Sequence, residues 1–208
     1  MTHDKLAAHL LVDRYGNFRL TGAVRPSPEL LVVPRQGYRR DTYRGPKAEL
    51  KVPVLAASVS AENLFDVFLD LLPPLGDVVD VVLETSHDAL DGEHRDLIRE
   101  EIDLPVLMSH FYDFEDLLLN DGCSGVAIIA RGQPIEVQFD EHKLLIVYGA
   151  DLRPFERVLR RAGVVRDDSL KLITEAEHLH STDPEHAEAF DQLCCRLGVG
   201  EFACGASL

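Results

Sequence analysis

Residues 125–148 read GVAIIARGQPIEVQFDEHKLLIVY, which we interpret as three successive β-strands separated by two short turns. Gly132-Gln133-Pro134 is typical of the first turn, and Asp140-Glu141 is typical of the second. Between the turns, residues 135–139 alternate apolar and polar side chains, which is the pattern of an antiparallel strand with one buried face. The stretch therefore predicts antiparallel strands in the middle of the chain.

The segment before this stretch predicts strands and helices in alternation. VLAASVS at 54–60 is continuous, small and β-branched, as in a buried strand, and Ser60 is a suitable N-cap for a helix that ends at Pro73. VVDVVLE at 78–84 predicts the next strand. After DGEH at 91–94 we expect a short helix that ends before Pro105.

The same order returns near the C-terminus. We expect a strand at 144–148, a helix from Asp151 to Gly163, a strand at 170–175, and a helix that starts at DPEH, 183–186, and stops at Gly198. Residues 54–104 and 144–199 then share one order: strand, helix, strand, DxEH, helix. We interpret the two spans as an internal pseudo-repeat. The alternative is that they share, by coincidence, the turn and cap residues that are common in α/β proteins.

These elements predict an α+β protein with a single compact domain over residues 1–208. Two similar strand-helix-strand-helix units, with added antiparallel strands, are expected to form a mixed sheet that helices cover around one shared core. A chain of 208 residues is long enough to bury such a core.

The charge distribution and composition exclude several functional classes. The net charge is −15, but residues 1–53 hold 10 Lys/Arg against 5 Asp/Glu, whereas the remainder holds 11 against 31. The acidic body should repel nucleic acids and anionic membranes. No apolar run approaches the roughly 18 residues of a membrane span, and no signal-peptide core precedes Asp13, so we expect a cytoplasmic protein. Its four cysteines include no CxxC pair.

The two DxEH motifs have a structural and a chemical interpretation. Asp at an N-cap, Pro at the first helical position and Glu in the first turn explain three of the four letters of DPEH as a helix start. The histidines stay unexplained. His178 and His180, two apart on a strand end, point the same way, and with His186 and Asp183 they are candidate ligands of a divalent transition metal. Asp183 or Glu177 would serve as the carboxylate ligand or general base.

Two other polar stretches have simpler interpretations. RQGYRRDTYRGPK, 35–47, offers Arg35, Arg39, Arg40 and Arg44 to an anion or a partner, but we favour neutralisation by the protein's own acidic surplus or by another subunit. DEHK, 140–143, predicts a turn in which the neighbouring carboxylates raise the pKa of His142.

Two functional hypotheses follow. Because no phosphate-binding loop, dinucleotide fingerprint, GxSxG elbow or HExxH motif is present, the first is a non-catalytic protein that acts through protein–protein contacts, as a homodimer or with another protein. The second is a metal-dependent hydrolase or metal-binding protein that uses the C-terminal His/Asp/Glu cluster. Nucleic-acid binding through residues 35–47 is a more distant alternative.

Overall fold

The predicted three-strand stretch is the centre of a seven-stranded antiparallel sheet. In the computed structural model, which describes residues 8–44, 51–87 and 95–199, these strands are β8 (Ser124–Ala130), β9 (Glu136–Phe139) and β10 (Leu145–Tyr148). The strand order is β4-β5-β10-β9-β8-β6-β7. The other four strands are β4 (Gly37–Arg44), β5 (Lys51–Ser58), β6 (Val78–Thr85) and β7 (Arg95–Asp103). The α+β class expected from the sequence is confirmed.

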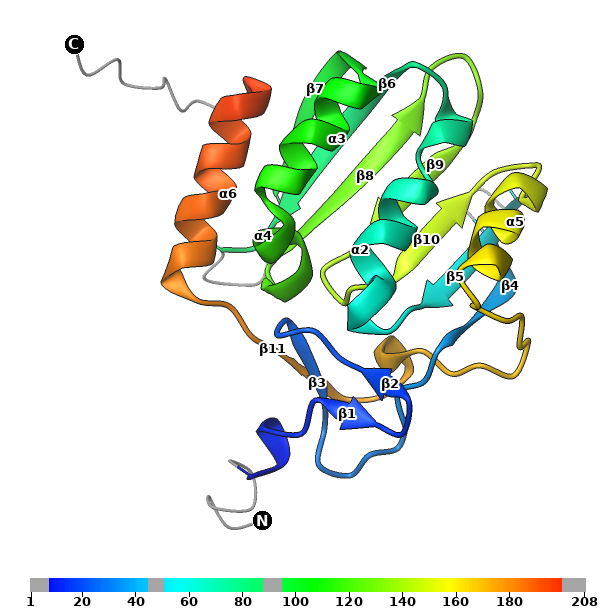
Figure 1. Cartoon of the computed structure of the whole chain (residues 1–208), viewed down its shortest axis with the longest axis vertical. Helices are drawn as coiled ribbons and strands as arrows, with labels where there is room; N and C mark the ends of the chain where they lie inside the picture. The colour runs from blue at the N-terminus through cyan, green and yellow to red at the C-terminus, as the bar shows by residue number, and fades with distance from the viewer. Residues whose placement is uncertain (1–7, 45–50, 88–94, 200–208) are drawn as a thin grey trace.

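Helices cover one face of this sheet (Figure 1). They are α2 (Ala61–Asp70), α3 (Leu104–Asp113), α4 (Glu115–Asn120), α5 (Arg153–Arg161) and α6 (Pro184–Leu197). Two short 3-10 turns, η1 (Pro73–Leu75) and η2 (Ile173–Glu175), precede β6 and β11. The helix stop predicted at Gly198 is confirmed, because Gly198 takes the left-handed conformation at the C-cap of α6, with φ +65°.

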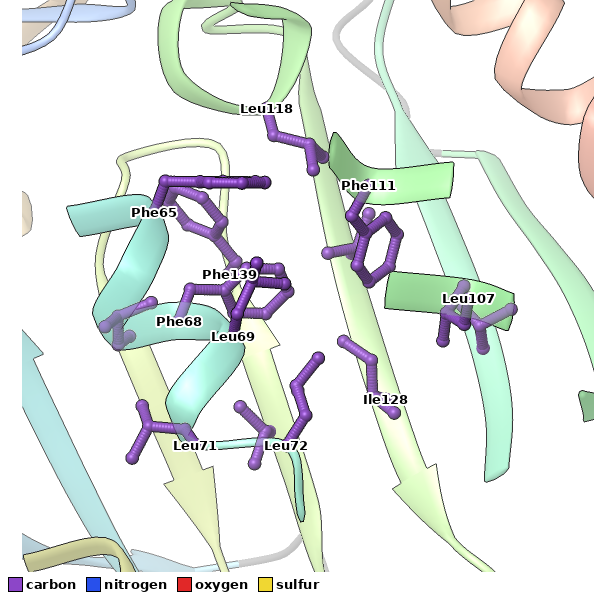
Figure 2. Close-up of a cluster of buried hydrophobic side chains, with 14 of the residues drawn as sticks. Phe65, Phe68, Leu69, Leu71, Leu72, Leu107, Phe111, Leu118, Ile128 and Phe139 are labelled. Atoms are coloured by element: carbon purple, nitrogen blue, oxygen red, sulfur yellow. The ribbon is translucent and has the colours of Figure 1, made fainter. Parts of the chain in front are cut away.

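One hydrophobic cluster fills the space between the helices and the sheet. Phe68 of α2 lies at its centre, with ring centroids 5.5 Å from Phe111 of α3 and 4.9 Å from Phe139 of β9 (Figure 2). All three side chains are almost fully buried. Burial of one such aromatic side chain stabilises the folded state by about 1.5–3 kcal/mol, so this face of the sheet holds the helices in place.

Two small sheets lie at one end of the large sheet, at the bottom of Figure 1. One is the hairpin β1 (Arg14–Tyr15) and β2 (Phe18–Arg19). The other pairs β3 (Val24–Pro26) with β11 (His178–His180), with His178 opposite Pro26 and His180 opposite Val24. This pairing brings a C-terminal strand to the end of the sheet where β6 ends and β8 begins.

Three predicted elements are wrong. Residues 95–103 form the edge strand β7, not a helix, because they pair with β6 from Val78 to Thr85, and this long-range pairing overrides the helical spacing of the apolar residues. Residues 170–175 contain η2 in place of a strand, and residues 29–34, ELLVVP, whose apolar run also predicts a strand, are irregular. Apolar runs this short do not determine the type of element by periodicity alone.

The internal repeat is not confirmed. The spans 54–104 and 144–199 share their first strand and helix, β5-α2 and β10-α5, but their next elements differ: β6 and β7 in one span, η2, β11 and α6 in the other. The large sheet also differs from the mixed sheet that we expected, since each pair of neighbouring strands within it is antiparallel. Within the described residues, no helix is both long enough and apolar enough to span a membrane.

Candidate metal centre

Three histidines from two distant parts of the chain gather at the end of the sheet where β11 lies. His142 is in the turn between β9 and β10, and His178 and His180 are the first and last residues of β11. One ring nitrogen from each lies within 4.8 Å of those of the other two. Because residues two apart on a strand project to the same side, β11 presents both of its histidines to His142.

The turn that carries His142 is held in place by its own side chains. Asp140 Oδ1 accepts a hydrogen bond from the Leu144 backbone N–H at 2.8 Å, and Asp140 Oδ2 lies 3.0 Å from His142 Nδ1. Lys143 takes the left-handed conformation, with φ +61°, and its Nζ donates to the Ser124 carbonyl at 2.9 Å. The turn is therefore tied to the first residue of β8.

The same hydrogen bonds select the tautomer of each ring. His178 Nδ1 lies 2.8 Å from the Ala176 carbonyl, and His180 Nδ1 lies 2.6 Å from the Gly122 carbonyl. A carbonyl or an ionised carboxylate only accepts, so Nδ1 carries the proton in all three rings. In the neutral ring the lone pair is then on Nε2. A metal-binding histidine is usually oriented by such a bond from its other nitrogen.

The charges around the site differ from ring to ring. Burial opposes the charged form of His142, but the hydrogen bond to Asp140 and the charges of Asp140 and Glu141 outweigh it, so the pKa of His142 is raised. This agrees with the shift expected from DEHK. Burial lowers the pKa of His180, and repulsion from the other two imidazoles adds to this effect. His180 is therefore neutral, as a metal ligand must be, near pH 7.

The site is open to solvent on one side. His180 is exposed, and His178 borders a shallow depression of about 820 Å³ that Glu29, Glu175 and Glu177 also line. Glu141 Oε1 lies 4.0 Å from His142 Nε2, next to the nitrogen that is available for a metal. The depression therefore gives a small ligand access to His178 from solvent.

Two of the four metal ligands proposed from the sequence lie elsewhere. His186 and Asp183 lie outside the three-histidine group and form the start of α6, where the Asp183 backbone N–H donates to His186 Nδ1 at 3.4 Å. His186 Nε2 lies 3.3 Å from Asp116 Oδ2 on α4. Both nitrogens of this ring thus have structural partners. Glu177 is exposed and is also outside the group.

The other polar sequence features have local roles or fall outside the described residues. Asp183 is the N-cap residue of α6, as DPEH predicts. DGEH, 91–94, lies outside the described residues.

The arginine-rich stretch forms the edge strand β4 and the segment before it. Arg35 is paired with Asp167 at 2.6 Å, and Arg39 is paired with Glu175. Arg40 forms a bidentate pair with Glu156 of α5, with both distances 2.7 Å. Arg44 is exposed at the end of β4. Neutralisation by the protein's own carboxylates, which we favoured over an anion site, therefore accounts for Arg35, Arg39 and Arg40.

His142 is the ligand candidate that the sequence did not reveal. Thirty-five residues separate it from His178, and DEHK is fully explained as a turn. Its one signal was the pair of acidic residues directly before it, which is typical of a histidine with a hydrogen-bonded, oriented ring.

Comparisons with known proteins do not add to this description. No protein-family model matches the chain, and neither the curated proteins nor the solved structures include a significant match.

Proposed function

We propose that this protein binds a divalent transition-metal ion through His142, His178 and His180, and that the bound ion activates water for hydrolysis. The observation that carries the proposal is the shared tautomer: all three Nδ1 atoms are engaged with acceptors, so all three Nε2 lone pairs are available. Three nitrogen ligands suit Zn²⁺.

The spacing of the rings supports this assignment. Tetrahedral nitrogen ligands at about 2.1 Å from Zn²⁺ are about 3.4 Å apart. One nitrogen atom of each ring lies within 4.8 Å of the other two, so the rings need to approach one another by at most about 1.4 Å to reach that separation.

A centre with three protein ligands has an open fourth position, where a water molecule can bind and lose a proton near neutral pH. Glu141 lies beside this position and is the candidate general base. This is the hydrolase alternative of the sequence hypotheses, with His142 in place of His186 and Glu141 in place of Asp183 or Glu177.

The alternative hypothesis, a non-catalytic protein that acts through protein contacts, has less support. It relied on the absence of catalytic sequence motifs and on the complementary charges of a basic N-terminal quarter and an acidic body. Three arginines of that quarter are already paired within the chain. Self-association, with a homodimer as the expected form, stays a prediction that is tested separately below.

Metal analysis of tag-free protein tests the proposal. Protein incubated with excess Zn²⁺ and then desalted is analysed by elemental mass spectrometry, and His178→Ala/His180→Ala should hold one Zn²⁺ per chain less than wild type. His186→Ala is the matched control, because it removes a C-terminal histidine that lies outside the group, and it should keep the wild-type content. Equal metal content in wild type and the double variant would overturn the proposal.

The catalytic half of the proposal has its own test. Zn²⁺-loaded protein is assayed against chromogenic carboxylic and phosphoric esters, and Glu141→Gln should lower turnover while the zinc content stays that of wild type. If no ester is hydrolysed faster by wild type than by the double histidine variant, the site binds metal without this activity.

A further inference from the structure

A second group of metal-ligand side chains lies in the loop before β8. One ligand atom each from His87, Asp121 and Cys123 lies within 4.8 Å of the other two. His87 follows the end of β6, and Asp121 and Cys123 precede β8. Because Thr85 pairs with Ser124 in the β6–β8 ladder, the two segments are held side by side.

The backbone around this group is fixed by hydrogen bonds. The Ser86 N–H donates to the Cys123 carbonyl at 2.9 Å, and the Cys123 N–H donates to Asp121 Oδ1 at 3.2 Å. Gly122 packs so tightly against the residues next to β3 and β11 that a Cβ atom there would lie 2.5 Å from the Ala23 carbonyl oxygen and 2.8 Å from the Ser181 carbonyl oxygen. The loop therefore has little freedom, and its side chains are held in a defined arrangement.

Two buried polar atoms of this group face each other without a well-aligned hydrogen bond. His87 Nε2 and Asp121 Oδ2 lie 3.0 Å apart, on side chains that are 9% and 0% exposed. Within the described part of the chain, neither atom has a hydrogen-bond partner in acceptable geometry. A buried polar group without a well-aligned hydrogen bond is unfavourable. Nitrogen and oxygen ligands of one tetrahedral zinc ion are about 3.4 Å apart, close to the separation of these two atoms.

The same residue types also occur in cysteine nucleophile triads, but the geometry here is different. In a triad, one imidazole nitrogen faces the thiol and the other faces the carboxylate. His87 Nδ1 lies 2.8 Å from Thr85 Oγ1, and Nε2 faces Asp121, so neither nitrogen is directed to Cys123. Burial also raises the pKa of the Cys123 thiol, which disfavours a reactive thiolate.

We propose that His87, Asp121 and Cys123 form a second metal site, for Zn²⁺ or a similar thiophilic divalent ion. The ion satisfies the two buried atoms together and takes the sulfur of Cys123 as a third ligand. Binding replaces the thiol proton, which passes to solvent. The site is separate from the three-histidine centre. The loop that carries Asp121 and Cys123 nevertheless contacts that centre, because the Gly122 carbonyl accepts the hydrogen bond of His180.

Cobalt titration distinguishes the two sites, because only this one contains sulfur. Co²⁺ added to metal-free, reduced protein should bind at two equivalents per chain, with a thiolate-to-cobalt charge-transfer band in the near ultraviolet. Cys123→Ser should remove the band and one equivalent. Cys195→Ser, the matched control on α6, should keep both. No thiolate band at saturating Co²⁺, or a band that Cys123→Ser leaves unchanged, would overturn the inference.

The outcome is independent of the proposed function. In His178→Ala/His180→Ala the thiolate band should stay while one equivalent of Co²⁺ is lost. If the double variant binds as much Co²⁺ as wild type but Cys123→Ser removes the band, the three-histidine proposal fails and the second site stands. If the double histidine variant loses one equivalent of Co²⁺ but Cys123→Ser loses neither the band nor an equivalent, the second site fails and the three-histidine proposal stands.

A measurement on wild-type protein avoids any folding defect of the variants. Zn²⁺ should slow alkylation of Cys123 by iodoacetamide about tenfold or more, as followed by peptide mass spectrometry, because the metal-bound sulfur is a poorer nucleophile. Cys195 in the same sample is the internal control. Equal rates for Cys123 with and without Zn²⁺ would count against the site.

Discussion

Asp140→Asn should weaken metal binding at the three-histidine centre without unfolding the turn. Asp140 holds the turn with one oxygen, through the Leu144 N–H at 2.8 Å, and orients His142 with the other, at 3.0 Å from Nδ1. Asparagine has the same shape and keeps one carbonyl oxygen as an acceptor, but it loses the negative charge. The change therefore removes the electrostatic support of His142 more than it removes the turn.

The magnitude follows from the kind of contact that is lost. Loss of a hydrogen-bond partner behind a metal ligand typically lowers affinity 10- to 100-fold, or by about 1.4–2.8 kcal/mol. The pKa of His142 should also fall, because burial is then opposed mainly by Glu141. A lower pKa reduces proton competition, so the affinities are best compared at about pH 8, where protonation of the ligands contributes little.

Competition with a chromogenic zinc chelator measures the affinity, and NMR of the imidazole protons measures the pKa of His142. Asp151→Asn is the matched control, since Asp151 also accepts a backbone N–H, from Arg153 at 3.1 Å, in the loop before α5. An unchanged zinc affinity in Asp140→Asn, or an equal loss in Asp151→Asn, would refute the reasoning.

Four further predictions concern stability, the loop between the sites, pH and assembly. Phe68→Ala should lower the free energy of unfolding by about 3–5 kcal/mol in urea titrations, because its fully buried ring packs on two other phenylalanines. Gly122→Ala should displace β11, since its Cβ would lie 2.8 Å from the Ser181 carbonyl oxygen, and zinc affinity at the three-histidine centre should fall about tenfold or more. Burial lowers the pKa of Lys143 from 10.5 to about 8. Between about pH 8 and pH 10.5 the unfolded chain therefore binds more protons than the folded chain, so the free energy of unfolding should rise with pH in this range. Lys143→Met should remove most of that rise relative to wild type, and the exposed Lys171→Met should keep it. Finally, light scattering across a range of concentrations should detect a homodimer.

Each of these has a clear contrary result. A loss below about 1 kcal/mol in Phe68→Ala would mean that the core repacks around the cavity. A zinc affinity equal to that of wild type in Gly122→Ala would mean that the loop at Gly122 does not hold the histidine centre in position. An unchanged pH slope in Lys143→Met would mean that the ammonium group is better solvated than its burial indicates. A monomer at all concentrations would exclude the predicted homodimer.

Local pattern and tertiary pairing contributed differently to the fold. The alternation at 135–139 and the turns on either side of it depend on adjacent residues, and β8, β9 and β10 appear as predicted. The start of α6 at Pro184 and its stop at Gly198 likewise follow from capping and backbone chemistry within a few residues. Residues 95–103 contain apolar residues at helical spacing, but β6 pairs with them along its length, with one register shift between Val79 and Val81, so they form a strand.

The same division holds for the candidate site. The spacing of His178 and His180 was enough to predict that they project to the same side, because the side-chain period of a strand is two. It did not determine their third partner, and His186 was chosen because it is near in sequence. The folding of the chain places His142 beside His178 and His180, and it likewise places His87 beside Asp121 and Cys123. Strand pairing sets which loops meet at the end of a sheet, and that pairing joins residues far apart in the chain.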